Sequence, residues 1–234
     1  MMIGGLGTNS SISNRLGSGR SDLFQAGAFL RHAVDAAYVV GALAYGWQDV
    51  TTDRTVTIAG ADQFRARFDA NAFSGRIEGG TRYVAPWTMD IGFTPYAAAQ
   101  FTTFDLPAYA ERVVSGANTL ALSYGSKRIT DYRSELGVRA DKSIALTGAL
   151  LTLRTRLAWA HDFNPDRSIA ATFQTLPGAS FVVNGAQQAR NAALTTASAE
   201  LTCMNGWSAA ASFEGEFSEV TRSYAGKGMV RYTW

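Results

Sequence analysis

The feature that most constrains the fold is an alternation with a period of two that separates charged from uncharged residues. Between Phe73 and Tyr83 the odd positions carry no charge, whereas the even positions include Arg76, Glu78 and Arg82. The segment from Thr130 to Asp141 repeats this sorting. Because successive side chains of a strand point to opposite faces, each segment predicts a strand with one apolar and one charged face.

The same alternation recurs along the rest of the chain. Clear examples are Leu151 to Trp159, Trp207 to Ser218 and Lys227 to Trp234. Weaker ones are Leu23 to His32, Tyr38 to Gln48, Ile91 to Phe104 and Ala197 to Cys203. These segments predict nine strands, and a tenth candidate lies within the first fifteen residues. The predicted fold class is all-β and antiparallel.

Two environments would suit such strands: a soluble barrel with its apolar face inside, or a membrane barrel with that face outside. The alternation persists beyond the five or six residues typical of soluble strands and approaches the roughly 9 to 11 that cross a bilayer. Only 17% of the 234 residues are charged, against about 25% in ordinary soluble domains. Both observations favour a transmembrane up-and-down β-barrel.

The connections between these segments alternate in length, as they do in outer-membrane barrels, which have short periplasmic turns and longer outer loops. The short ones are His32 to Asp35, Ala85 to Asp90, Asp141 to Gly148 and Met204 to Gly206. The long, irregular ones are Asp49 to Ala61, Leu106 to Ala117 and Asp162 to Ala179.

The charged faces of a membrane barrel would point into a wet lumen, where opposite charges on neighbouring strands can pair. In a soluble barrel the same residues would form an ordinary solvated exterior. The predicted lumen-facing residues are Arg76, Glu78, Arg82, Arg133, Glu135, Arg139, Arg154, Arg156, Glu214, Glu216 and Arg231.

Tryptophans lie near the ends of the predicted strands. This position is typical of residues at a membrane–water interface, because the indole ring can contact lipid at one end and water at the other. The alternative is that they fill a soluble core. The predicted interfacial aromatic residues are Trp47, Trp87, Trp159 and Trp207.

Residues suited to catalysis or metal binding are scarce. His161 and Asp162 are the only adjacent histidine and acid, but neighbours in a strand face opposite ways, and no Gly-x-Ser-x-Gly elbow is present. Cys203 is the single cysteine. The Gly-rich run from Leu16 to Arg20 lacks the Gly-Lys-Ser/Thr ending of a phosphate loop and is predicted to be a turn. We therefore expect no enzyme activity, metal or cofactor.

Charge and hydropathy narrow the partners further. The 21 basic residues are scattered and nearly balanced by 19 acidic ones, so no nucleic-acid footprint is predicted. The longest apolar stretches fall short of the roughly 20 residues that a membrane helix needs. The first residues lack the basic and apolar regions of a secretory signal.

A set of motifs in order along the chain resembles the C-terminal translocator of bacterial autotransporters, the type V secretion system. The similarity extends from about Leu16 to Trp234. The runs that carry it are LGSGRSDLFQAG, GALAYGWQDVTTDR, RIEGGTRY, TPYAAAQ, TDYRSELGVRAD, LTLRTRLAWAHDF, FQTLPGASFVVNGA, SAELTCMNGWSAAASFEGEFS and YAGKGMVRYTW.

The resemblance implies a 12-stranded barrel in the bacterial outer membrane that helps to export a passenger fused to its N-terminus. It also implies that Val230, Tyr232 and Trp234 form the signal read by the barrel assembly machinery, although the family more often ends in Phe. With nine or ten strands of an expected twelve, the chain looks truncated at its N-terminus. Residues 1–20 would be a partial strand and turn, and residues 21–234 the barrel domain.

The expected function is thus an outer-membrane translocator domain, with membrane lipid, the assembly machinery and a passenger as partners. Two alternatives stay open. The first is a small passive porin or surface-antigen barrel, which would conduct solutes without a passenger. The second is a soluble β-barrel that binds an apolar ligand or hydrolyses an ester, with its apolar face inside.

Overall fold

The computed structural model describes residues 17–58, 60–84, 90–164, 168–185 and 188–233, and the backbone of residues 2–12. Strands make up most of this described chain, whose one helical element is the short 3-10 helix Asn118–Leu120. Among the described residues, no helix has the length and apolar character needed to cross a membrane. The prediction of an all-β protein is confirmed.

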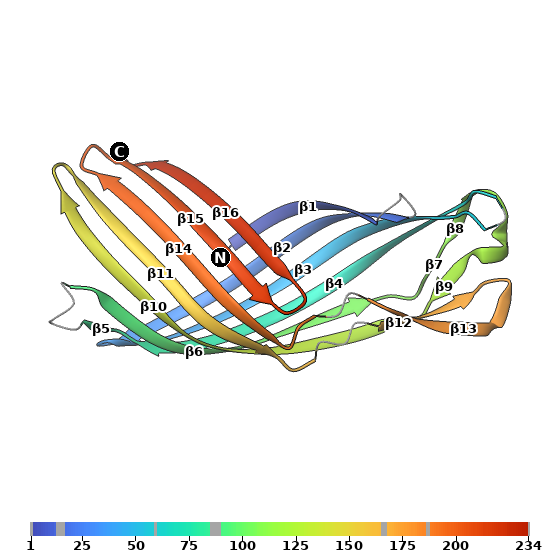
Figure 1. Cartoon of the computed structure of the whole chain (residues 1–234), viewed down its shortest axis with the longest axis horizontal. Helices are drawn as coiled ribbons and strands as arrows, with labels where there is room; N and C mark the ends of the chain where they lie inside the picture. The colour runs from blue at the N-terminus through green and yellow to red at the C-terminus, as the bar shows by residue number, and fades with distance from the viewer. Residues whose placement is uncertain are drawn as a thin grey trace.

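Ten long strands form one antiparallel sheet in which successive long strands are neighbours (Figure 1). In sheet order they are β1 (Met2–Ile12), β2 (Gly17–Val34), β3 (Ala37–Val56), β4 (Asp62–Thr81), β6 (Gly92–Leu106), β10 (Lys127–Leu146), β11 (Ala149–Asp162), β14 (Asn191–Cys203), β15 (Trp207–Ser218) and β16 (Arg222–Tyr232). Two short strands also belong to this sheet: β5 (Tyr83–Val84) pairs with β6, and β8 (Arg112–Ser115) pairs with β4. All nine predicted strands are present, and β1 is the tenth.

A second, four-stranded sheet is built from the two longest connections. Its order is β13 (Leu176–Asn184), β12 (Ser168–Phe173), β9 (Leu122–Tyr124) and β7 (Tyr109–Ala110). The prediction of irregular loops at residues 106–117 and 162–179 is therefore wrong, because β7 lies in the first segment and β12 and part of β13 lie in the second. We call this unit the outer sheet.

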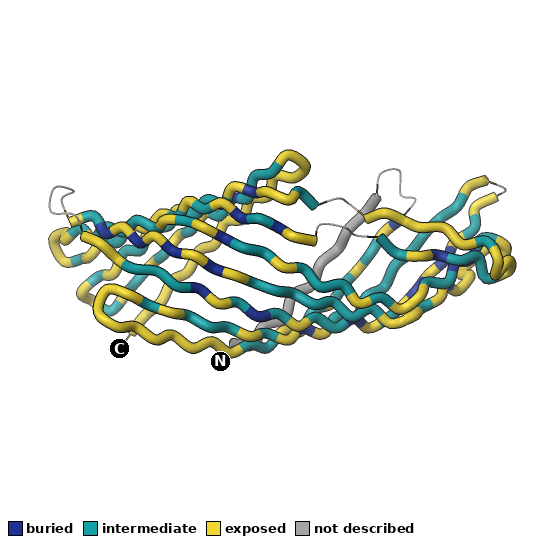
Figure 2. Tube along the Cα trace, turned by 90° about the horizontal axis from the view of Figure 1, so that it is seen from below, coloured by how far each residue is buried: buried dark blue, intermediate teal, exposed yellow. Residues whose placement is uncertain are grey.

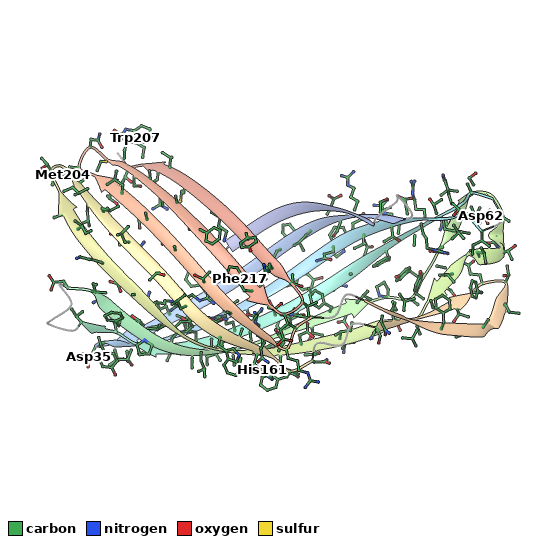
Figure 3. The ribbon with its side chains drawn as sticks, in the orientation of Figure 1. Asp35, Asp62, His161, Met204, Trp207 and Phe217 are labelled. Atoms are coloured by element: carbon green, nitrogen blue, oxygen red, sulfur yellow. The ribbon has the colours of Figure 1, made fainter. Side chains whose placement is uncertain are left out.

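The two ends of the long strands differ. Figure 3 shows Asp35, Met204 and Trp207 at one end and Asp62 at the other. The first end, which we call the inner end, carries tight turns in which Asp35 and Gly206 adopt positive φ angles of 50° and 88°. Positive φ is the conformation that Gly and Asp tolerate best. The opposite, outer end carries the outer sheet (Figure 1).

Several strands are longer than their alternation predicted. The predicted loop at residues 49–61 is mostly strand, because β3 continues to Val56 and β4 begins at Asp62. The turn predicted at residues 16–20 is wrong for residues 17–20, because β2 begins at Gly17. The link predicted at residues 141–148 shrinks to two residues, because β10 runs to Leu146.

The main sheet curls, and side-chain contacts identify its inside. Arg139 on β10 donates a 2.6 Å hydrogen bond to the hydroxyl of Tyr38 on β3, although β4 and β6 lie between these strands. Arg133 on β10 likewise reaches Glu216 on β15 at 2.7 Å, across β11 and β14. Strands three places apart are roughly 14 Å apart in a flat sheet, so such contacts require a curved one. We call the face that bears these residues concave and the opposite face convex.

Candidate functional site on the concave face

Buried charges form a network at the inner half of the concave face. The carboxylate of Glu78, only 7% exposed, accepts hydrogen bonds from Arg139 at 2.7 and 2.9 Å and from Arg76 at 2.9 Å. The hydroxyl of Tyr38 donates to the same carboxylate at 2.9 Å. These partners come from β3, β4 and β10, so the network ties three strands together.

A second carboxylate, Glu135 on β10, continues the network and is 4% exposed. Arg76 donates to it at 3.0 Å, and Arg156 and Tyr96 are also hydrogen-bonded to it. Arg156 donates to the Tyr96 hydroxyl at 2.6 Å as well. Since a buried charge is costly unless it is paired and hydrogen-bonded, this shared arrangement is what allows both carboxylates to be ionised inside the curve.

Two tyrosines of this network each lie across from a glycine. Tyr96 pairs with Gly137 and Tyr38 with Gly80 in the strand register. A Cβ atom at Gly137 would lie 2.7 Å from the Tyr96 hydroxyl oxygen, and one at Gly80 would lie 2.9 Å from the Tyr38 hydroxyl oxygen. The missing side chains thus leave room for the rings to lie against the sheet and reach the glutamates. The Arg139 guanidinium stacks over the Tyr96 ring, 4.1 Å from its centroid.

Further ion pairs extend the charged surface along the concave face. They are Arg82 with Asp141 at 2.6 Å, Arg154 with Glu200 at 2.7 Å, Arg133 with Glu216 at 2.7 Å and Lys227 with Glu214 at 2.8 Å. Arg231 lies opposite Ser208 in the register, on the same face of β16 as Lys227. The structure therefore places all eleven predicted charged residues along this face, where most of them pair with one another or with neighbouring strands.

A cavity of about 930 Å³ opens on the inner half of the concave face. Arg31, Tyr38, Glu78, Arg139 and Arg156 are among its lining residues. Arg31 lies over the Tyr38 ring at 5.1 Å from its centroid. A cavity of this size with charged walls suits a hydrated, polar occupant better than an apolar ligand.

The convex face has the opposite character over the same inner half. Leu43, Tyr45 and Trp47 on β3 and Phe73 and Ile77 on β4 are exposed there. Figure 2 shows how exposed and more buried positions alternate along the strands. The eight residue steps from Val39 to Trp47 correspond to about 27 Å along a strand, or about 20 Å across a membrane at a tilt of roughly 40°. This height is close to that of the apolar band of membrane barrels.

Three of the predicted interfacial tryptophans lie on this convex face. Trp47 lies midway along β3 and Trp159 near the outer end of β11, whereas Trp207 is at the inner end of β15, where its ring is 5.0 Å from that of Tyr232. Trp159 donates to Asn191 at 3.1 Å. Trp87 and Trp234 lie outside the described residues. The tryptophans thus mark two levels on one face.

Beyond Trp47 the polarity of β3 and β4 reverses. Ion pairs now occupy the convex face, where Arg65 binds Asp53 at 2.7 Å and Arg67 binds Asp49 at 3.1 Å. The register between β3 and β4 continues without a shift past Trp47 and Phe73. The ion pairs therefore lie on the same convex face as these two aromatic residues. The side chains of the convex face therefore change from apolar to charged between Trp47 and Asp49. A soluble barrel with its apolar face inside throughout does not account for the inner half.

The outer half of the concave face is correspondingly apolar and is covered by the outer sheet. Phe64, Ala66 and Ala70 on β4 are buried. The ring of Phe68 stacks on that of Tyr109 in β7, with a centroid distance of 4.0 Å. The outer sheet therefore packs inside the curve, above the charged network.

One buried ion pair anchors the outer sheet to β3. Arg54 donates to both oxygens of Glu111, at 2.8 and 2.5 Å, and to the backbone carbonyl of Leu120 at 2.8 Å. The hydrogen bonds with Glu111 raise the pKa of Arg54. Burial raises the pKa of Tyr109 to about 12 and also raises the pKa of Tyr124, whose ring stacks on it at 4.6 Å. The outer sheet is thus a packed unit with its own core.

The family described as Autotransporter beta-domain matches residues 1–214, most of the chain. The chain belongs to this family. The prediction drawn from the sequence motifs is confirmed. Among curated proteins, no significant sequence match is found.

Two solved autotransporter structures have the same fold. The translocator domain of autotransporter NalP from Neisseria meningitidis superposes with a TM-score of 0.68 at 16% identity, covering 94% of this chain and 70% of that one. The beta domain of the Bordetella autotransporter BrkA gives a TM-score of 0.58 at 16% identity, covering 99% and 91%. The curled antiparallel sheet of the present chain is thus an autotransporter β-domain sheet.

Sequence reasoning missed several residues of the site. Tyr38 and Tyr96 join the charged network, and Gly80 and Gly137 make room for them. A signal was available for the glycines, because Gly80 and Gly137 have the parity of the charged positions beside them on β4 and β10. It was lacking for Tyr38 and Tyr96, because residues 37–48 and 92–104 contain no charged residue. Arg54 and Glu111 were missed because their segments were assigned to loops.

Proposed function

We propose that this autotransporter β-domain lies in the bacterial outer membrane and assists the export of a passenger fused to its N-terminus. The observation that carries the proposal is the polarity reversal on β3 and β4. An apolar convex band bounded by Trp47 suits lipid, and the charged concave face opposite it suits a wetted passage. The role is transport rather than catalysis.

The charged network suits passage of an unfolded chain. Glu78 is held by Arg139 of β10 and by Arg76 of its own strand, and Glu135 by two arginines from other strands. The wall therefore presents paired charges instead of a binding pocket for one sequence. Such a surface hydrates a moving polypeptide without holding it, because neutralised charges offer no strong attraction to either sign. The predicted lumen-facing residues are therefore proposed to line the passage.

Assembly into the membrane would use the last strand. Tyr232 and Val230 are exposed on the convex side of β16, which is an edge of the sheet. An exposed edge with aromatic anchors is a suitable handle for strand addition by the barrel assembly machinery. We include Trp234 in this signal on the strength of the family resemblance.

The test is to express the chain in a Gram-negative host behind a signal peptide and a reporter passenger. Protease added to intact cells should digest the passenger, while the same passenger with a signal peptide but no β-domain should stay protected. A passenger that stays inside, although the β-domain reaches the outer membrane, would overturn the export proposal. Steady ion conductance by the purified chain without a passenger would favour the porin alternative.

A further inference from the structure

A groove of about 600 Å³ crosses the convex face over β2, β3, β4, β6 and β10. The strand register places its walls on the same face as the apolar band. These walls are formed by Leu30, Leu43, Ile77, Phe101 and Tyr132. The side chains that enter it from the convex face carry no charge, and we call it the apolar groove.

Two glycines keep the floor of the apolar groove low. Gly41 lies between Leu30 and Ile77 in the register, and a Cβ atom added there would meet nothing within 4 Å. A Cβ atom at Gly75 would lie 2.5 Å from the Phe101 ring, so this ring lies directly against the backbone of β4. The backbone thus forms the floor, and side chains of neighbouring strands stand on either side of it.

The apolar groove runs obliquely over the sheet. Gly41 is four residues from the inner end of β3, whereas Tyr132 is five residues from the outer end of β10. The four strand-to-strand steps from β2 to β10 span about 19 Å. One leaflet of the hydrocarbon core is about 15 Å deep. A single acyl chain of a lipid therefore matches the apolar groove in length as well as in polarity.

The outer mouth of the apolar groove is polar. Beyond Tyr132 on the same face of β10 comes Thr130, whose hydroxyl is hydrogen-bonded to that of Thr103 at 3.0 Å. Arg128 follows; its side chain is 73% exposed and pairs with Asp105 on β6. A guanidinium has five N–H donors, of which a carboxylate bound side-on occupies two. Arg128 therefore keeps donors for a second anion, and phosphate is one whose geometry a guanidinium matches.

We propose that the apolar groove holds one acyl chain of an outer-leaflet lipid, with the phosphate of the lipid head group against Arg128. This inference rests on the proposed location of the β-domain in the membrane. The apolar groove is part of the band bounded by Trp47, so its occupant comes from the lipid that surrounds that band. Because an apolar channel ends beside a guanidinium, the site selects a phosphate-bearing lipid over a neutral one.

The test counts the molecules of dimyristoyl phosphatidylglycerol that the purified full chain retains in detergent, by native mass spectrometry. Gly41→Leu fills the apolar groove and should weaken retention of the first lipid about tenfold. Ala99→Leu, which fills it from β6, should act in the same way. Gly226→Leu is the matched control, because Gly226 lies on the convex face opposite Phe213 and a Cβ atom there also meets nothing within 4 Å.

A second measurement changes the head group. Dimyristoyl glycerol, which lacks the phosphate, should bind about fivefold more weakly than the phospholipid. Arg128→Gln should remove this preference and leave binding of the neutral lipid unchanged. Arg222→Gln is its control, because Arg222 is exposed on the convex face at the outer end of β16 and lies outside the apolar groove.

Three results would overturn the inference: equal retention in the groove-filling and control variants, several lipids bound with equal affinity, or a head-group preference that survives Arg128→Gln. Recovery of the folded chain in the soluble fraction of cells would instead refute the proposed function.

Discussion

The inner and outer halves of β3 and β4 carry the same alternation with opposite polarity. In the inner half, Tyr38 and Glu78 lie on the concave face while Leu43 and Ile77 lie on the convex face. In the outer half, Phe64 is buried on the concave face, and arginine–aspartate pairs cover the convex one. The backbone pairing runs through the change without a break.

The difference shows that solvent, not strand geometry, sets the polarity of each face. A strand in water hides its apolar side inside, whereas a strand in lipid exposes it and directs its charges to the interior. Under the proposed function, the outer boundary of the membrane lies at the reversal between Trp47 and Asp49. Both halves still bury charge: the inner network shares it among five strands, and in the outer half of β3 the buried pair is Arg54 with Glu111.

The largest expected effect comes from breaking the inner network. Glu135→Ala leaves Arg76 and Arg156 without a common carboxylate and should destabilise the barrel by about 3 kcal/mol, the low end for a broken buried ion pair because both arginines keep some solvent contact. Urea unfolding in detergent micelles measures the loss. In the outer half, Glu111→Ala should likewise cost about 3 kcal/mol, but it should loosen only the outer sheet, seen as protease cleavage there at unchanged barrel stability. Equal global losses would mean that the two halves unfold as one unit.

The second prediction tests the proposed membrane boundary by placing a charge at two positions on the convex face of β4. Ile77→Arg puts a charge on the convex face of the inner half and should destabilise the barrel by about 2 to 4 kcal/mol if that face meets the middle of the bilayer. Gln63→Arg, on the same face of β4 in the outer half, should change the stability by less than about 0.5 kcal/mol. The measurement is the temperature at which each folded band is lost on a gel in detergent. Similar temperatures for the two variants would contradict the membrane boundary at Trp47.

The smallest effect distinguishes the halves by pH. Because burial raises the pKa of Tyr109 to about 12, above its ordinary 10.0, the neutral ring stabilises the outer sheet fully below pH 10. That contribution is lost as the pH rises from 10 to 12. Protease cleavage in residues 107–126 should therefore increase over this range while the folded barrel persists. Tyr109→Phe, which keeps the stack on Phe68, should abolish this component and the matching late rise in tyrosinate absorbance. An unchanged pH profile in the variant would show that another group controls the loosening.

The parts of the fold that sequence could predict are those where one alternation persists. Two strands are easy to predict, those at Phe73 to Tyr83 and Thr130 to Asp141. Their charged and uncharged residues alternate, as expected for a strand with an apolar medium on one side and water on the other. The prediction ended β3 near Gln48, since beyond it the apolar residues change parity and the pattern looks like a loop. In fact only the polarity of the two faces changes there, and the hydrogen-bonded ladder continues.

The sequence could predict which face of the sheet carries the candidate site, but not which residues pair with one another there. Alternation alone assigned Arg76, Glu78, Glu135 and Arg139 to one side of the sheet. It could not indicate that Arg139 reaches Tyr38 across two strands, because that contact depends on how tightly the sheet curls. It also could not assign roles to Gly80 and Gly137, whose importance lies in the ring that occupies the space opposite each one.

The sequence by itself therefore determined the strands, the sorting of charge and the family, all of which follow from local periodicity and ordered motifs. Tertiary structure alone decided the ion-pair network, the outer sheet and the apolar groove. The physical reason is that strand alternation is a property of neighbouring residues, whereas Arg54 with Glu111 and Arg133 with Glu216 are brought together from 57 and 83 residues apart. Contacts over such separations are set by register and curvature, which belong to the sheet as a whole.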